Sequence, residues 1–443
     1  MYNTNDRQYI FKQSNGVVWN FFYDDKLGIC YSTMNKRSNW TNAVSLHKNA
    51  IRHFFADMDR EDRFHTLFQD NQGTMHYSCL DGDSIKSIPV LNSKTPLAYN
   101  KHLYLIAIKN NIHIFYVLQH EGSYIFAYQI LHDGKINNPK VIDYVADCGF
   151  PYSIIFDKAF DIYAFYQSSD GKYLQIGYKK YNILQKFWSE FTPVTKYADN
   201  CEYPRTIMDN NNIIHLCYQR HTTKHFEMVY QQKVPDKNLW TNEVIVHSST
   251  HSFENASILS LDDNIIIYWI REGVIYCNTG NQSGNSWGKP LKYNYPANKQ
   301  FVCMFYKTNN IYEEERIAAK DIPGSFIGGL KFAFYQQSSV NGDNLSVEEL
   351  KTLILDSLKL LKTSVEELKE TDNNFMEEIA KLNNRYDELE KELVKCSVKS
   401  NYLETQLSQA KSFNTRLDTI SSELRQIRSR MDMTDQNTII KLT

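Results

Sequence analysis

The feature that most constrains this 443-residue sequence is a unit that recurs about every 45 to 52 residues through its first three quarters. The segment "IIHLCYQ" (213–219) has five counterparts, and one position in them is held by Trp19, His65, His113, Tyr163, His215 and Ile267. The spacings between these residues are 46, 48, 50, 52 and 52. A period of this length indicates a repeat architecture.

Each unit reads as four short strands. A tyrosine recurs in the strand after the repeated position, as Tyr31, Tyr77, Tyr128, Tyr178, Tyr230 and Tyr276. A tryptophan opens the next element in four units, as Trp40, Trp188, Trp240 and Trp287. Four-stranded units of this period predict an all-β propeller. We expect seven blades, the seventh running from "FVCMFYKTNNIYEEERI" (301–317) to "GGLKFAFYQQ" (328–337), and six remains an alternative.

The repeat also assigns a role to residues that look reactive in isolation. A position that accepts Trp, His, Tyr and Ile is interpreted as one that needs bulk on a half-buried strand. We therefore expect His215 and Cys217 to be packing residues.

Composition excludes several classes of function. With 49 basic and 51 acidic side chains, the chain lacks the positive excess of a nucleic-acid-binding protein. No 18-residue apolar run and no secretion signal is visible. We therefore expect that the protein is made in the cytoplasm and does not insert into a membrane. The cysteines lack the spacing of a metal site, and neither a metal nor a cofactor is expected; they are Cys30, Cys79, Cys148, Cys201, Cys217, Cys277, Cys303 and Cys396.

The turn "GNQSGNSW" (280–287) resembles the Asp-box of sialidase-like and lectin propellers. Gly284, Ser286 and Trp287 match that motif, whereas Gln282 stands in place of its aspartate. The resemblance implies that a sialidase would use three arginines, for which Arg52, Arg205 and Arg271 are candidates. Glu202 or Glu272 would then serve as carboxylates. The chain departs from the family because it has no Arg-Ile-Pro motif near its start.

Two loops, "YVADCGFPYSI" (144–154) and "YADNCEYPRTI" (197–207), are near copies placed between blades. Aromatic rings beside an arginine and a carboxylate can hold a sugar, although such loops could also serve only to turn the chain. The candidate ligand-binding residues are Tyr152, Glu202, Tyr203, Arg205, Arg52, Arg220 and Arg271.

The composition changes after Gly342, since no glycine or proline follows. Apolar residues then recur every seven positions, which predicts a coiled coil; they include Leu361, Leu368, Phe375, Leu382, Leu389, Leu403, Leu417 and Leu424. We predict a propeller over 1–337, a linker over 338–345, a coiled-coil stalk over 346–433 and a tail over 434–443. Parallel pairing would bring Arg385 to Glu390 of the neighbouring chain. Asn414 favours two chains and Tyr386 three, so dimer and trimer stay open.

These features predict a non-enzymatic protein that displays propeller heads in several copies on a stalk and binds a glycan or a protein surface. One alternative is a sialidase-like glycoside hydrolase. The other is an assembly scaffold of a spore, appendage or phage-type fibre, since the Asn, Lys, Ile and Tyr content resembles that of uncharacterised propeller proteins of spore-forming anaerobic bacteria. A surface, spore or appendage location after release would fit.

Overall fold

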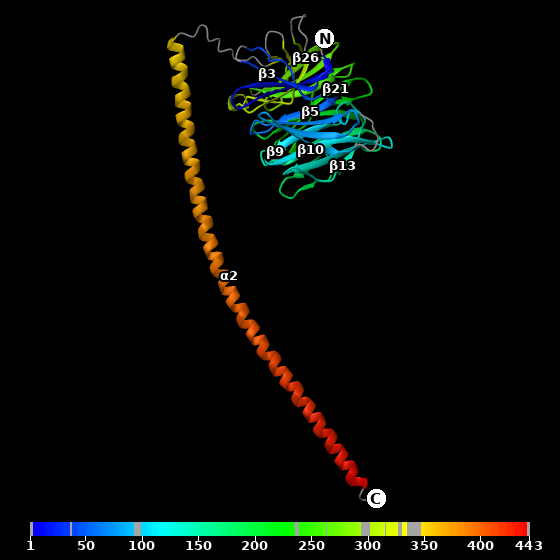
Figure 1. Ribbon diagram of the computed structural model, residues 1–443, viewed down its shortest axis with the longest axis vertical. Coiled ribbons are helices and arrows are strands. Elements are labelled where there is room, and N and C mark those ends of the chain that lie inside the picture. Colours follow the sequence, from blue (N-terminus) through cyan, green and yellow to red (C-terminus); the bar gives the residue numbers. More distant parts are fainter. Residues whose placement is uncertain are drawn as a thin grey trace. The chain divides into compact units, whose positions relative to one another are not determined.

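The computed structural model describes residues 3–35, 38–92, 99–234, 239–262, 264–293, 302–314, 316–326, 330–334 and 347–440. The chain divides into two compact units, Met1–Gln337 and Ser338–Thr443. The first is built almost wholly of β-strands, and the second contains one long helix (Figure 1).

The described strands of the first unit form six sheets that follow one another along the chain. The first sheet contains β1 (Asn3–Lys12), β2 (Val18–Asp24), β3 (Gly28–Met34), β4 (Val44–His47), β28 (Val302–Thr308), β30 (Asp321–Ser325) and β31 (Lys331–Phe332). The second contains β5 (Ala50–Met58), β6 (Phe64–Asp70), β7 (Met75–Asp81) and β8 (Ser84–Leu91). The third contains β9 (Tyr104–Ile108), β10 (Asn111–His120), β11 (Ser123–His132), β12 (Lys135–Ile136) and β13 (Lys140–Val145).

The last three sheets repeat the same plan. The fourth contains β14 (Tyr152–Phe156), β15 (Ile162–Ser169), β16 (Leu174–Asn182), β17 (Phe187–Trp188) and β18 (Thr192–Pro193). The fifth contains β19 (Asn200–Met208), β20 (Ile214–His221), β21 (Phe226–Val234), β22 (Leu239–Trp240) and β23 (Val244–Ser249). The sixth contains β24 (Glu254–Leu261), β25 (Asn264–Arg271), β26 (Val274–Asn281), β27 (Leu291–Lys292) and β29 (Ile317–Ala319). Neighbouring strands within each repeat pair antiparallel, as the repeat predicts.

The segment expected to form a seventh blade does not make a sheet of its own. Strands β28, β30 and β31 join the first sheet, because β28 pairs in parallel with β1. Strand β29 pairs instead with β24 of the sixth sheet, and the short helix α1 (Ile311–Glu314) lies between β28 and β29 in the chain. The described strands therefore give six sheets rather than the seven we preferred, and the last segment links the first sheet to the sixth.

The repeated position is not held by bulk alone, which corrects the interpretation made from the sequence. His65, His113 and His215 are buried, and the Nδ1 atom of each lies 2.7 Å from a tyrosine hydroxyl of the next strand. The tyrosines are the recurrent Tyr77, Tyr128 and Tyr230. Three of the six units thus place a histidine here that hydrogen-bonds across the sheet, whereas Ile267 fills the same position with a buried apolar side chain.

An aspartate six residues earlier completes this arrangement in two sheets. Nε2 of His65 lies 3.0 Å from Asp59, and Nε2 of His215 lies 3.2 Å from Asp209. Burial alone would lower the pKa of His65, but its bonds to Asp59 and Cys79 outweigh burial and raise the pKa to about 9. His113 has no such partner among its described contacts, and burial lowers its pKa to about 4. The presence or absence of this aspartate thus accounts for the opposite pKa shifts of His65 and His113.

The Asp-box-like turn folds around a different residue from the one the motif suggested. The side-chain oxygen of Asn281 accepts the backbone N–H groups of Asn285 and Ser286. Gly284 has a φ of +64°, and the indole of Trp287 donates to its carbonyl oxygen at 2.9 Å. Asn281, rather than Gln282, supplies the acceptor that an aspartate provides in such a turn.

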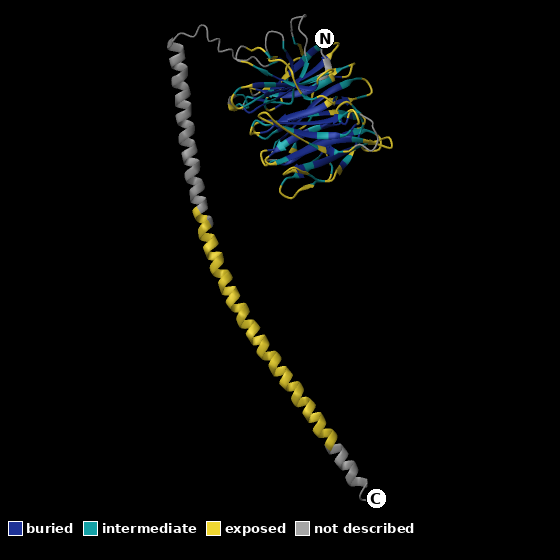
Figure 2. Cartoon of the chain, in the orientation of Figure 1, coloured by how far each residue is buried: buried dark blue, intermediate teal, exposed yellow. Residues whose placement is uncertain are grey.

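The second unit is the helix α2 (Val347–Ile440), of 94 residues. At about 1.5 Å per residue it is roughly 140 Å long. It runs beyond position 433, where we expected the stalk to end. Every side chain described between residues 380 and 430 is exposed, in contrast to the buried strands of the first unit (Figure 2). No helix in the described residues is both long and apolar enough to cross a membrane.

Candidate functional site

The first strands of the six sheets meet around one cavity of about 590 Å³. Each of these strands contributes at least one lining residue, namely Arg7 and Tyr9 of β1, Phe54 of β5, Tyr104 of β9, Tyr152 of β14, Arg205 of β19 and Asn255 of β24. Lys320 and Asp321 complete the wall. Lys320 directly follows β29 of the sixth sheet, and Asp321 is the first residue of β30 in the first sheet. We call this space the cationic cavity.

Irregular backbone at the cavity aims several of these side chains inward. The pairing register shifts between Ala50 and Phe54 in the second sheet and between Glu202 and Arg205 in the fifth. A third shift lies between Glu254 and Ser257, and it includes Asn255 at a φ of +49°. Bulges of this kind re-aim side chains, and they place Arg205 and Asn255 at the cavity.

Positive charge dominates the lining. Arg7, Arg52, Arg205 and Lys320 carry cationic groups, and Asp321 is the one carboxylate among the described lining residues. His53 and His102 add no charge near pH 7, since burial lowers the pKa of both, that of His102 to about 4. The cavity therefore attracts anions.

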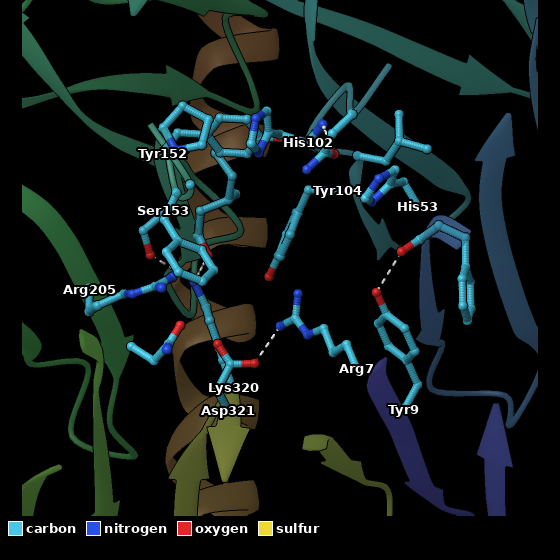
Figure 3. Close-up of a pocket in the computed structure, with 18 of the residues that line it drawn as sticks. Arg7, Tyr9, His53, His102, Tyr104, Tyr152, Ser153, Arg205, Lys320 and Asp321 are labelled. Carbon is cyan, nitrogen blue, oxygen red and sulfur yellow. Dashed lines mark hydrogen bonds and ion pairs between the residues drawn. The ribbon is translucent and has the colours of Figure 1, made fainter. Parts of the chain in front are cut away.

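The guanidinium of Arg7 is held in place by both charge and rings. Its Nη2 lies 2.5 Å from Oδ1 of Asp321, and its central carbon lies 5.4 Å from the ring centres of Tyr9 and Phe305 (Figure 3). Burial opposes the charge on Arg7, but Asp321 outweighs burial and raises the pKa of Arg7 further. Arg7 thus stays charged with its direction fixed.

Arg205 is the second fixed guanidinium. Its Nε donates to the carbonyl oxygen of Ala256 at 3.1 Å, and its central carbon lies 3.5 Å from the ring centre of Phe150. Burial lowers the pKa of Arg205, and the attraction of Asp321 offsets this only in part. Its terminal nitrogens are available to a ligand with a planar acidic group.

Lys320 is a buried amine at the floor of the cavity. Its Nζ donates to the carbonyl oxygen of Ile154 and, at 3.3 Å, to Oγ of Ser153. Burial lowers the pKa of Lys320 to about 7, with Arg205 and Arg7 adding to the effect and Asp321 opposing it. An anion arriving here would stabilise the charged form of the lysine.

Three of the residues singled out from the sequence lie together at this cavity. Tyr152 lines it but uses its hydroxyl on the carbonyl oxygen of His102, so it offers a ring rather than a free donor. Arg205 projects from the fifth sheet as described above. Arg52 lies at the exposed rim, 3.2 Å from Asp25 and over the ring of Tyr23.

The other four sequence candidates lie outside the cavity lining. Arg220 is buried between Glu227 and Glu243, at 2.6 and 2.8 Å, where it ties strand β20 to its neighbours. Glu202 directly precedes the bulge in β19, Tyr203 lies within it, and Arg271 is exposed at the end of β25. The arginine set Arg52, Arg205 and Arg271 is therefore not brought together.

The sequence analysis missed Arg7, Tyr104, Lys320 and Asp321. A signal for Tyr104 lies in the repeat, because it precedes His113 by nine residues, much as Arg205 precedes His215 by ten. In each unit, the residues about ten positions before the repeated position lie close to the cationic cavity or line it. Lys320 and Asp321 follow no repeat, so no such comparison reaches them.

Nothing in the described structure points to a metal centre. No group of three or more His, Cys, Asp or Glu residues capable of holding a metal ion occurs in the described ranges. The chemistry of the cavity is that of its cations, aromatic rings and amide groups.

Comparison with known proteins finds no matching family model and no matching curated protein. Solved structures do show similarity. An ulvan lyase of polysaccharide lyase family 25, bound to a -[GlcA(1-4)Rha3S]- ligand, has 12% identity and a TM-score of 0.49, covering 72% of this chain and 89% of its own. A mutant Aleuria aurantia lectin in complex with Fucα1-6GlcNAc has 11% identity and a TM-score of 0.40, covering 66% and 98%.

A neuraminidase-like protein of a little yellow-shouldered bat isolate from Guatemala has 9% identity and a TM-score of 0.39, covering 64% of this chain and 92% of its own. Binding proteins and enzymes therefore both occur among the similar structures, and the likeness does not separate the two kinds of function.

Proposed function

We propose that the first unit is a six-bladed β-propeller that binds an acidic saccharide in the cationic cavity without transforming it. The observation that carries the proposal is that all six sheets converge on one cavity with four cationic side chains and one carboxylate. A volume of about 590 Å³ lies within the usual range for small-ligand sites.

The geometry suits a carboxylate on a sugar ring. Arg7 and Arg205 can each present parallel N–H donors to two oxygens of an acidic group. Tyr104 and Phe150 supply flat apolar faces for the sugar ring, as aromatic side chains do at ligand sites. A neutral sugar would gain the rings but not the charge, so acidic saccharides are favoured.

Hydrolysis by paired carboxyls is not the function we propose. That chemistry needs two carboxyl groups on either side of the scissile bond. Among the described lining residues Asp321 alone has a carboxylate, and it is already bound to Arg7. Binding is therefore better supported than glycoside hydrolysis.

The saccharide proposal is tested by calorimetric titration of a uronic-acid oligosaccharide and its reduced, neutral counterpart. The acidic ligand should bind, and Arg205→Met should weaken it by about 10- to 100-fold, as expected for loss of a charge-assisted hydrogen bond. Arg271→Met, which removes an arginine outside the cavity, is the matched control and should leave affinity unchanged. Equal binding of both ligands would contradict the proposal.

We further propose that α2 assembles with copies of itself as a parallel coiled coil, so that the heads are displayed together. In the described part of the helix the heptad residues Leu389, Leu403, Leu417 and Leu424 are between 46 and 61% exposed. A helix this long needs a partner to bury such a stripe. The side chains of Leu361, Leu368, Phe375 and Leu382 lie outside the described residues, and the predicted linker 338–345 does as well.

The coiled-coil proposal predicts that the full chain has two or three times the molar mass of a single chain in solution. Sedimentation equilibrium of the full chain should give a dimer or trimer, and a chain ending at residue 337 should be monomeric. Multivalent display should also strengthen retention on a saccharide surface by about 100-fold or more relative to the truncated head. A monomeric full chain at micromolar concentration would show that the seam is covered in another way.

A further inference from the structure

The first strands enclose a second cavity beyond the floor of the cationic cavity. It has a volume of about 500 Å³, and it shares Tyr104, Ile154 and Lys320 with the cationic cavity. Its remaining wall comes from the opposite ends of β5, β9, β14 and β19, from the loops beside them, from α1, and from β28 and β29. We call it the aliphatic cavity.

Branched apolar side chains form one continuous part of that wall. Ile106, Ile155, Ile207 and Ile317 line it and are each no more than 8% exposed. They come from the third, fourth, fifth and sixth sheets, whereas the first and second sheets contribute charged side chains such as Lys307 and Asp57. The apolar part of the wall offers favourable burial to an aliphatic chain.

The acidic side chains of this cavity are already paired. Asp57 lies 2.7 Å from Nζ of Lys307, and Asp59 lies 2.7 Å from Nε of Arg63. Glu61 also pairs with Arg63 at 2.7 Å, and Glu314 pairs with Arg60 at 2.5 Å. A cationic ligand would have to break one of these pairs.

Two cations of the lining remain without a carboxylate in the described structure. Lys109 is exposed and lies 4.9 Å from the centre of the Phe160 ring. Lys320 lies at the boundary with the cationic cavity, bonded only to uncharged oxygens of Ile154 and Ser153. Of the two, Lys320 gains more from an anion, because water screens a buried charge less than an exposed one.

We propose that the aliphatic cavity binds a small amphipathic carboxylate, with its aliphatic chain against the isoleucine wall and its carboxylate at Lys320. This site adjoins the proposed saccharide site and shares Lys320 with it, but the proposal does not require that a saccharide binds. The lowered pKa of Lys320 adds a consequence, since a carboxylate bound there restores the ammonium charge and takes up a proton near pH 7. The two cavities also compete for one amine.

Octanoate is the probe that tests this site, with octanol and octylamine as chain-matched controls. Titrated into the full chain at pH 6.5, octanoate should bind, octanol should bind at least about 10-fold more weakly, and octylamine should not bind measurably. Lys320→Met should reduce octanoate affinity to that of octanol. Lys109→Met should leave it unchanged.

A cavity-filling variant separates this site from the saccharide site. Ile207→Trp should abolish octanoate binding while the acidic oligosaccharide still binds in the cationic cavity. If Ile207→Trp lowers the thermal midpoint of unfolding, Ala107→Leu fills the same space with a smaller change. Absence of octanoate binding, equal binding of octanol, or binding insensitive to both filling variants would overturn the proposal, whatever the outcome for the saccharide.

Discussion

The two cavities share the strands β5, β9, β14 and β19 yet differ in charge and surface. The cationic cavity holds four cations against one carboxylate, with aromatic rings around them. The aliphatic cavity pairs each of its acids with a cation, and isoleucine, alanine and aromatic side chains form the apolar part of its wall. A single set of strands can therefore offer two environments, because residues at its two ends are chosen independently.

One ion pair from each cavity sharpens the comparison: Asp57 with Lys307 at 2.7 Å, and Asp321 with Arg7 at 2.5 Å. Asp57 is 2% exposed and bound to Lys307, whereas Asp321 is more accessible and bound to Arg7. Removing the cation leaves an uncompensated carboxylate, which costs about 3–5 kcal/mol when it is buried. We expect Lys307→Met to lower the free energy of unfolding by about that amount, and Arg7→Met by less.

Denaturant unfolding of both variants measures the difference. The second substitutions Asp57→Asn and Asp321→Asn should restore most of the stability in each case, since they remove the stranded charge. If Arg7→Met proves the more damaging change, the two pairs contribute to stability in the opposite order to their burial.

A single added carboxylate should reduce the positive charge of the cationic cavity and so bring its charge closer to that of the aliphatic cavity. Asn255→Asp adds a carboxylate to the lining without changing volume, and aspartate tolerates the positive φ of this position. We expect affinity for the acidic oligosaccharide to fall about 10-fold, through Coulombic repulsion at partly screened distances. Isothermal titration provides the measurement.

The matched control is Asn110→Asp, because Asn110 lines the aliphatic cavity and is exposed. It should leave the affinity for the oligosaccharide unchanged. An equal loss in both variants would mean that the overall charge of the unit, rather than the cationic cavity, governs binding.

The sequence predicted the repeated sheets well because side-chain alternation and turn residues are local signals. Arg205 and Tyr152 could be predicted from the sequence because they lie in two similar loops. The same reasoning also selected Arg220, which is paired with Glu227 and Glu243 and is not available to a ligand. Whether an arginine is free or paired depends on contacts between strands far apart in the chain. Local sequence patterns carry no information about these long-range contacts.

The last segment shows the same limit at the level of topology. Its strands resemble a seventh unit in composition, yet β28 pairs in parallel with β1, almost 300 residues away. That pairing brings Lys320 and Asp321 to the cavity. Two of the five charged groups that line it thus come from the part of the chain where the repeat fails.

The smallest expected effect is the change of ligand affinity with pH, which depends on the amine of Lys320 that both cavities share. The pKa of Lys320 is lowered to about 7 in the free protein, mainly by burial, so the amine loses its charge as pH rises from 6 to 8. An anionic ligand binds the charged form more tightly, so affinity for the acidic oligosaccharide should fall severalfold across this range. Lys320→Met should remove the dependence on pH as well as weaken binding, and titrations at four pH values would show it. The same slope for octanoate would place its carboxylate at the same amine, whereas a flat profile for either ligand would mean that this ligand does not reach Lys320.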